Sequence, residues 1–360
     1  SCKLEHVESD LSTDLKISIS HLADLIQNIH DELEPRQAYL LKGGAHQNLV
    51  REEVFLSKVK NQIFPEISNA VQAFEIASEQ AIHEGVEIEF TNLAHKHLYP
   101  VLLCSPFISR VVERPIGVPG DFDILGKILG DPFEGNSLLS RLINGWILTT
   151  TAAGAYRHRV NFLADEIAAL LSGDEKKANV LSLGSGVAYE VQKLLQGGGL
   201  VDPVNFTLVD FNETTLKEAR STLCELRDIH DASDIHFKFI KKSVKELLRA
   251  SEADRSGNIH LAYCAGLFDY LSDRVCILVI RYLFNQLAPG GRMVVCNFTP
   301  FNPIKHFMGL VLDWKLIHRS VGELRQLILE AELGESAHLS MITDPGQVEA
   351  YGIIDKSRNP

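Results

Sequence analysis

A glycine-rich turn between an apolar run and an amphipathic stretch constrains this chain more than any other feature. The run is Val180-Leu-Ser-Leu-Gly-Ser-Gly-Val-Ala-Tyr189, and the amphipathic stretch covers residues 190–195. Continuous apolar character is typical of a strand buried in a parallel sheet. A turn that points its N–H groups at an anion needs residues without an obstructing Cβ, and Gly184 and Gly186 meet that need. We therefore expect Gly184, Ser185 and Gly186 to form the ligand-binding turn. The pattern predicts a strand, a ligand-binding turn and a helix. An ordinary tight turn that binds no ligand would show the same residues.

Composition narrows the class of ligand. The chain has 360 residues, which is long enough for two domains. Its content of 45% hydrophobic and 23% charged residues is ordinary for a globular protein. A net charge of -12 repels phosphate backbones and anionic lipid, so we expect a small-molecule substrate and neither nucleic acid nor membrane as partner. The six cysteines form no C-x-x-C pair or zinc-spaced cluster, so we expect no metal. No apolar stretch approaches 18 residues, and we expect a soluble cytoplasmic protein of unspecified oligomeric state.

The N-terminal half carries helical patterns. Apolar residues recur at helical spacing from about residue 12 to residue 85, with a flexible loop expected at 43–48. Further helices are expected at 92–103, 138–146 and 155–171. Between them, Arg114-Pro-Ile-Gly-Val-Pro-Gly-Asp-Phe-Asp123 holds two prolines and two glycines. This stretch is either a linker or, as its charged residues favour, an ordered lid over a ligand.

After residue 176 the pattern changes to alternating strands and helices, which predicts a parallel sheet with crossover helices. We therefore divide the chain into a helical N-terminal domain and lid, 1–176, and an α/β domain, 177–360. Strands are expected near residues 180–184, 204–210, 236–240, 259–264, 292–298, 337–343 and 349–355.

An acidic residue ends the second of these strands. Asp210 closes the apolar run Phe206-Thr-Leu-Val, about 26 residues after Gly184. In doubly wound folds an acid at this point accepts hydrogen bonds from the ribose hydroxyls of an adenosine. Asp210 could instead cap the helix expected over 213–226. Nicotinamide cofactors and S-adenosylmethionine share these features, so the later strands decide between them.

The later strands resemble those of the class I S-adenosylmethionine-dependent methyltransferase fold. A Pro289-Gly-Gly turn precedes an apolar strand, and two strands around Asp344-Pro-Gly346 can pair as a hairpin. The resemblance covers about residues 175–355. It implies an α/β, doubly wound, Rossmann-like sheet of seven strands whose last strand is antiparallel, and S-adenosylmethionine as co-substrate or substrate.

Five motifs are similar to a bacterial subfamily with a helical N-terminal extension. They are Arg114-Pro-Ile-Gly-Val-Pro-Gly-Asp121, Pro132-Phe-Glu-Gly135, Leu181-Ser-Leu-Gly-Ser-Gly186, Gly266-Leu-Phe-Asp-Tyr-Leu-Ser-Asp273 and Asp313-Trp-Lys-Leu-Ile-His-Arg319. The subfamily includes enzymes assigned to methyl esterification of 3-hydroxy fatty acids, and is related to cyclases that make azetidine-2-carboxylate. Two residues depart from it. Ser182 stands where methyltransferases often have an acid that contacts the methionine amino group, and Val118 stands where the subfamily has tyrosine.

Cofactor-binding residues are expected where the strands end. Ser243 and Val244 can line the adenine slot, although Ser243 would also suit a helix N-cap. Ala265 and Gly266 end the fourth strand, where small residues let the backbone approach the methionine arm. Asp121 and Arg157 are our candidates for holding the amino and carboxylate groups of that arm.

Candidate catalytic residues come from the same edge and from the lid, where Asp121 lies. Tyr270 either places its ring against the sulfonium or packs in the core. Asn297 ends the fifth strand, and the apolar segment 298–314 is expected to cover the pocket. His318 could serve as base and Arg319 could hold a substrate carboxylate; both could equally be exposed charges at a helix end.

Three functions follow. The first is methyl transfer to an oxygen of a small hydroxy acid. The second makes the cofactor the substrate: its amino group attacks Cγ and gives azetidine-2-carboxylate and methylthioadenosine, a path that the missing acid at Ser182 and the altered Val118 favour. The third is a non-catalytic binding module, against which the retained Gly184, Gly186 and Asp210 argue.

Overall fold

The computed structural model describes residues 11–40, 45–117, 120–173, 177–200, 203–249 and 257–358. Two compact units divide the chain. Unit 1 extends to Gly154 and includes Pro303–Lys315, and unit 2 comprises Ala155–Asn302 and the chain from Leu316 onward. The first boundary between the compact units, after Gly154, thus differs from the expected domain boundary at residue 176. That domain boundary stays a prediction.

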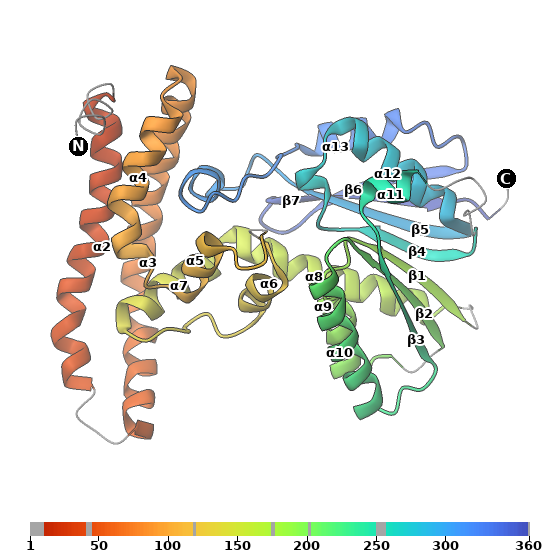
Figure 1. The fold of residues 1–360 in the computed structure, drawn as a ribbon, viewed down its shortest axis with the longest axis horizontal. Helices are drawn as coiled ribbons and strands as arrows, with labels where there is room; N and C mark the ends of the chain where they lie inside the picture. The colour runs from red at the N-terminus through yellow and green to blue at the C-terminus, as the bar shows by residue number, and fades with distance from the viewer. Residues whose placement is uncertain are drawn as a thin grey trace. The chain divides into compact units, whose positions relative to one another are not determined.

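Unit 1 is built from helices, shown from red to yellow in Figure 1. Its longest helix contains residues 45–48, so the loop expected at 43–48 was wrong for these four, and residues 43 and 44 lie outside the described ranges. The helix expected at 92–103 begins earlier, at Glu87. The helices of this unit are α2 (Thr13–Leu40), α3 (Ala45–Glu84), α4 (Glu87–Leu102), α5 (Pro106–Glu113), α6 (Phe122–Leu129) and α7 (Leu138–Thr149).

A late segment of the chain, Pro303–Lys315, completes unit 1. It contains a short π-helix, η3 (Phe307–Val311). The carboxylate of Glu75 in α3 accepts the backbone N–H groups of His306, at 3.0 Å, and Phe307, at 2.6 Å. The ring of Phe307 lies 5.6 Å from that of Trp146, between centroids. Polar bonds and apolar packing therefore hold this segment among the helices.

Unit 2 contains a seven-stranded sheet of order β3-β2-β1-β4-β5-β7-β6. Strand β7 runs antiparallel to β5 and β6, whereas the other neighbouring pairs are parallel. This arrangement confirms the predicted fold class, with its antiparallel last strand and terminal hairpin. The strands are β1 (Ala178–Leu183), β2 (Val204–Asp210), β3 (Ile235–Lys241), β4 (Ile259–Cys264), β5 (Leu287–Phe298), β6 (Ala337–Thr343) and β7 (Glu349–Lys356).

Strand β5 is longer than the expected 292–298. It already pairs with β4 at Leu287, and the register shifts before Arg292 because Pro289-Gly-Gly lies between them. Gly290 has φ 81°, in the left-handed region that favours glycine. The Pro-Gly-Gly sequence therefore produces an irregularity inside the strand, where a turn before the strand was expected.

Helices cover both faces of the sheet (Figure 1). One face packs against α8 (Thr151–Leu171), α9 (Tyr189–Gln196) and α10 (Glu213–Ile229). The other packs against α11 (Val244–Leu248), α12 (Asp273–Gln286) and α13 (Val321–Glu330). The order of the parallel strands reverses between β1 and β4. Ligands of open α/β sheets bind at such a switch point, beyond the carboxyl ends of the strands.

Candidate ligand-binding site

The glycine turn after β1 has the backbone that the sequence predicted. Gly184 and Gly186 have φ values of 69° and 53°. A Cβ at Gly184 would lie 2.5 Å from Leu267 Cγ, so a larger residue would clash there. At Gly186 a Cβ would meet no described atom within 4 Å, so the positive φ is what requires glycine and the space beside it is open. The N–H groups of Gly184 and Ser185 both donate to Val209 O, at 2.8 and 3.0 Å, which ties the turn to β2.

Asp210 is joined directly to this turn. Its Oδ2 accepts the Gly186 N–H at 3.0 Å, and its Oδ1 accepts the Asn212 N–H at 2.8 Å. Burial raises the pKa of this carboxyl, and the N–H donors oppose that effect. The cap of α10 is Asn212, whose side chain accepts from Thr214 N and Thr215 N, so Asp210 is not the cap. The strand's last residue is thus a buried carboxylate held beside an open glycine turn.

A second buried carboxylate lies close to Ser182. Tyr263 of β4 donates its hydroxyl hydrogen bond to Glu190 Oε1 at 2.6 Å, and it is also hydrogen-bonded to the Ser182 side chain. Glu190 is buried, and burial raises its pKa. Sequence reasoning missed Glu190, since its place in an amphipathic helix gave no sign that it faces inward. Tyr263 therefore links a buried carboxyl group to Ser182.

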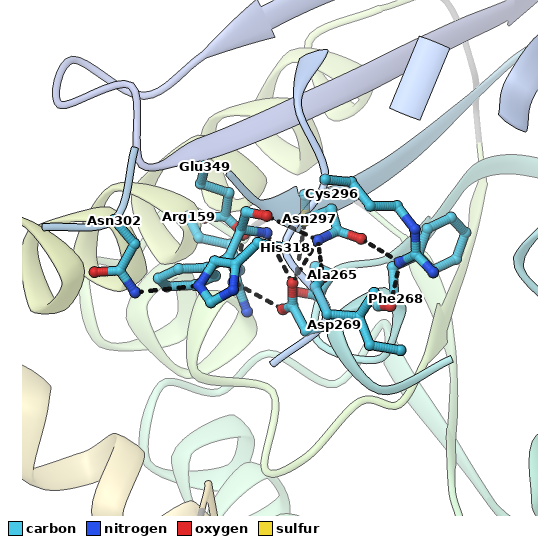
Figure 2. A network of polar contacts seen from close by, with 12 residues as sticks. Arg159, Ala265, Phe268, Asp269, Cys296, Asn297, Asn302, His318 and Glu349 are labelled. Atoms are coloured by element: carbon cyan, nitrogen blue, oxygen red, sulfur yellow. Dashed lines mark hydrogen bonds and ion pairs between the residues drawn. The ribbon is translucent and has the colours of Figure 1, made fainter. Parts of the chain in front are cut away.

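A buried ionic cluster, Arg159–Asp269–Glu349, occupies the ends of β4, β5 and β7 (Figure 2). Arg159 of α8 forms an ion pair with Glu349, and its Nη2 also lies 4.0 Å from Asp269 Oδ2. The three residues are 8%, 4% and 0% exposed, in chain order. Burial raises the pKa of Glu349 to about 7, although Arg159 opposes the shift. None of the three was predicted as a site residue.

Asn297 holds Asp269 in place. Its Nδ2 donates to Asp269 Oδ1 at 2.9 Å and to Ile317 O at 2.8 Å, and Phe298 N donates to the same carboxylate oxygen at 2.7 Å. Asn297 is fully buried, so these contacts give it a positioning role. Its predicted contact with substrate stays a prediction.

His318 lies beside this cluster (Figure 2). Its Nε2 is 3.4 Å from Nδ2 of the buried Asn302. Which ring nitrogen donates depends on the tautomer of the imidazole. The role of His318 as a base stays a prediction.

Arg319 has a different role from the expected one. Its guanidinium donates to Phe268 O, Leu271 O, Asn297 Oδ1 and Asp273 Oδ1 at 2.6–2.9 Å, through Nε and both Nη atoms. These bonds use all five N–H donors of an arginine. We therefore correct the expectation of a carboxylate clamp: Arg319 instead ties the chain after β4 to the end of β5.

The other predicted residues of unit 2 described next follow strands β3 and β4 in the chain. Tyr270 is 45% exposed, which excludes core packing. Ser243 is the N-cap of α11, in a capping box with Glu246, and Val244 follows it half-buried. Ala265 and Gly266 are half-buried after β4.

The two residues expected at the methionine arm lie in different units. Asp121 belongs to unit 1, where it caps α6 by accepting from Ile124 N at 2.9 Å and pairs with Arg110 at 3.2 Å. Arg157 is half-buried in α8 of unit 2. Val118 lies outside the described residues. The lid and its ligand contacts remain predictions.

No helix among the described residues combines the length and apolarity needed to cross a bilayer. No three His, Cys, Asp or Glu side chains within the described ranges gather as metal ligands would.

Comparison with known proteins gives structural likeness only. No protein-family model and no curated protein matches the chain. A possible exported protein from Bordetella parapertussis is 16% identical, with a TM-score of 0.48 over 85% of this chain and 97% of that one. Magnesium protoporphyrin IX methyltransferase from Synechocystis, solved with bound SAH, is 14% identical, with a TM-score of 0.44 over 70% and 100%. The methyltransferase (CMeT) domain of the citrinin polyketide synthase is 13% identical, with a TM-score of 0.46 over 86% and 70%. The assignment of the fold depends on the strand order, and not on these likenesses.

Proposed function

We propose that unit 2 binds S-adenosylmethionine at the carboxyl ends of β1, β2 and β4 and transfers its methyl group to an oxygen of a small acid. The observation that carries the proposal is the 3.0 Å bond between Asp210 and Gly186, which joins a buried carboxylate to an open glycine turn. The position of this pair at the switch point of the sheet supports an adenosine ligand.

The residues present fit the adenosine part of the ligand. A carboxylate has about four lone-pair positions, so Asp210 can accept ribose hydroxyls in addition to its backbone donors. The open side of Gly186 allows the ligand to approach the backbone closely. Ser243 and Val244, at the start of α11, follow β3 and supply an edge for the base.

Methyl transfer itself demands little chemistry from the protein. An acceptor oxygen attacks the methyl carbon in line, the carbon–sulfur bond breaks, and its electron pair stays on sulfur, giving S-adenosylhomocysteine. A carboxylate acceptor needs no base, whereas a hydroxyl acceptor would pass its proton to a base, for which His318 is our candidate. The protein contributes alignment and exclusion of water.

Product analysis tests the proposal. The purified chain is incubated with S-adenosylmethionine, with and without a panel of short and long 3-hydroxy acids. Acid-dependent formation of S-adenosylhomocysteine and a methyl ester is the expected result. Methylthioadenosine with a cyclic imino acid, formed without any acceptor, would replace transfer by cyclisation. The absence of both binding and turnover would leave a non-catalytic module.

A matched pair of variants tests the site. Asp210→Ala should weaken S-adenosylmethionine binding by roughly 1–3 kcal/mol, because ribose hydroxyls lose a buried acceptor. Asp228→Ala, at an exposed carboxylate near the end of α10, is the control and should bind as the wild type does. Equal affinities for all three proteins, measured by calorimetry, would remove Asp210 from the site.

A further inference from the structure

The sheet of unit 2 has two edge strands of different character, β3 and β6, both labelled in Figure 1. Strand β3 presents the exposed side chains of Lys238 and Lys241, and lysines on an edge strand discourage pairing with the strands of other chains. Strand β6, Ala337-His-Leu-Ser-Met-Ile-Thr343, contains no Asp, Glu, Lys, Arg or Pro. Strand β6 therefore lacks the residues with which sheet edges usually prevent association.

The hydrogen bonds at the two ends of β6 show which of its backbone groups point away from β7. In an antiparallel pair, residues that exchange backbone hydrogen bonds with the neighbouring strand alternate with residues that do not. Ser336 O accepts from Ser357 N at 2.8 Å, and Asp344 N donates to Glu349 O at 3.0 Å. The even-numbered residues of β6 thus bond to β7, and the odd-numbered residues direct their N–H and C=O groups to the outer edge.

These outward groups are almost all without a partner inside the described ranges. Ala337 N donates to Gly334 O at 3.3 Å. The backbone groups of Leu339, Met341 and Thr343 take part in no other backbone or side-chain hydrogen bond of the described residues. They form a row of donors and acceptors to which a further strand can bond.

The side chains of β6 suit a further strand as well. Leu339 and Met341 are half-buried and pack against the core cluster that includes side chains of α13. His338, Ser340 and Ile342 lie on the opposite face and are exposed. A strand placed beside β6 would cover apolar surface of Leu339 and Met341 on one face and of Ile342 on the other.

The charge of the chain favours a second copy as that strand. A net charge of -12 makes two copies repel each other wherever their acidic surfaces meet. Residues 336–343, however, include no acidic or basic side chain other than His338. If two copies of β6 pair antiparallel around Ser340, the exposed Glu335 lies opposite Pro345 of the second copy. Like charges therefore do not meet along this edge.

We propose that β6 pairs antiparallel with β6 of a second copy, about a two-fold axis at Ser340. Centring on Ser340 pairs the whole strand and sets outward-pointing residues opposite each other. Leu339 exchanges both backbone hydrogen bonds with Met341 of the second copy, and Ser340 faces its own counterpart in the pair between them. A two-fold contact closes on itself, and the lysines of β3 protect the other edge, so the product is a dimer with one continuous sheet.

Cysteine cross-linking tests the position of the axis. Ser340→Cys places two thiols opposite each other in a pair that exchanges no backbone bonds, where Cα atoms are about 4.5 Å apart. A disulfide spans about 4.4–6.8 Å between Cα atoms, so mild oxidation should convert most of this variant into a covalent dimer. Gln326→Cys, at an exposed position of α13, and the wild type with its six cysteines are the controls and should stay largely uncross-linked.

A mixing experiment tests the register. His338→Cys of one copy lies opposite Ile342→Cys of the other, whereas two copies of His338→Cys hold their thiols about 14 Å apart, at about 3.4 Å per residue. Each variant alone should therefore form little covalent dimer. A mixture of the two, carrying tags of different size, should form the mixed dimer after subunit exchange. Equal cross-linking of the single variants and the mixture would contradict this register.

Two substitutions test the dimer without added thiols. Met341→Pro removes an N–H that points away from β7, a place where an edge strand tolerates proline. It should raise the dissociation constant measured by analytical ultracentrifugation about 10- to 100-fold, because each dimer loses two backbone hydrogen bonds. Ser340→Lys changes only an exposed side chain and sets two ammonium groups opposite each other, so it should also favour the monomer. Gln326→Lys is its matched control.

Circular dichroism melting curves identify any variant that is unfolded, and Ser340→Lys decides the matter if Met341→Pro is. A dimeric wild type that both substitutions weaken, together with the Ser340→Cys cross-link, supports the inference. A wild type that is monomeric at every concentration overturns it and leaves the edge to a strand of another protein. A dimer that survives Ser340→Lys and yields no Ser340→Cys cross-link also overturns it, because the copies then meet elsewhere.

Discussion

Glu75 should make the stability of unit 1 depend on pH near neutrality. Burial raises the pKa of this carboxyl from 4.5 to about 7, although the N–H groups of His306 and Phe307 lower it in part. The folded chain therefore holds the proton more tightly than the unfolded chain. By linkage, the free energy of unfolding falls as pH rises from about 4.5 to about 7, and the loss persists above that.

The size of the effect follows from the two pKa values. Their difference of about 2.5, from 4.5 to about 7, corresponds to about 3 kcal/mol in total, at 1.36 kcal/mol for each pKa unit. Between pH 5 and pH 8 about 2.5 kcal/mol of this should be lost. Glu75→Gln cannot ionise, so its stability relative to the wild type should rise by that amount over the same interval. Any constant cost of the substitution cancels in this comparison.

Tryptophan fluorescence measures unit 1 selectively. The chain has two tryptophans, Trp146 and Trp314, and both belong to this unit. Urea unfolding of the wild type and Glu75→Gln at pH 5 and pH 8 gives the four free energies required. Glu66→Gln changes an exposed carboxylate of the same helix and should follow the wild type. Parallel pH profiles for Glu75→Gln and the wild type would refute the reasoning.

Three further substitutions test unit 2 by thermal or urea unfolding. Arg319→Met should destabilise it by about 3–5 kcal/mol, because buried acceptors lose a charged donor; a loss under 1 kcal/mol would contradict the structural role we give it. Gly184→Ala should cost about 1–3 kcal/mol, because its Cβ would overlap Leu267 and its φ is positive; unchanged stability would mean that the turn is not rigid. Ser243→Ala should cost about 1 kcal/mol through loss of the α11 cap, and an effect only on nucleoside binding would show that Ser243 serves the ligand instead.

The sheet could be predicted largely because strands such as β1 and β2 are apolar and mostly buried. The expected and observed bounds of β2 and β6 agree. The position of Asp210 at the end of β2 was predictable from the apolar run before it, and its contact with a ligand stays a prediction. What local sequence could not show was the irregularity in β5, which depends on pairing with Ile259 far along the chain.

The charged residues of the site were harder to assign. Arg159 and Glu349 lie in stretches that resemble packing helix and ordinary strand, and only the fold brings them together. Arg319 carried the right chemistry for a clamp, but two of its four partners are backbone carbonyls, which leave no trace in sequence. The apolar run 298–314 was expected to cover a pocket, and its larger part packs within the helical unit.

The path of the chain through Pro303–Lys315 has a consequence for protein engineering. The backbone passes between the compact units at residues 154/155, 302/303 and 315/316, so no single cut separates them. Deleting the N-terminal helices would remove the ring contacts of Phe307 with Phe74 and Trp146 and leave an exposed apolar segment between β5 and α13. A chimaera that exchanges the helical part must therefore include this segment too. A single crossover would separate the segment from the helices it packs against, and we expect the resulting chimaeric proteins to misfold.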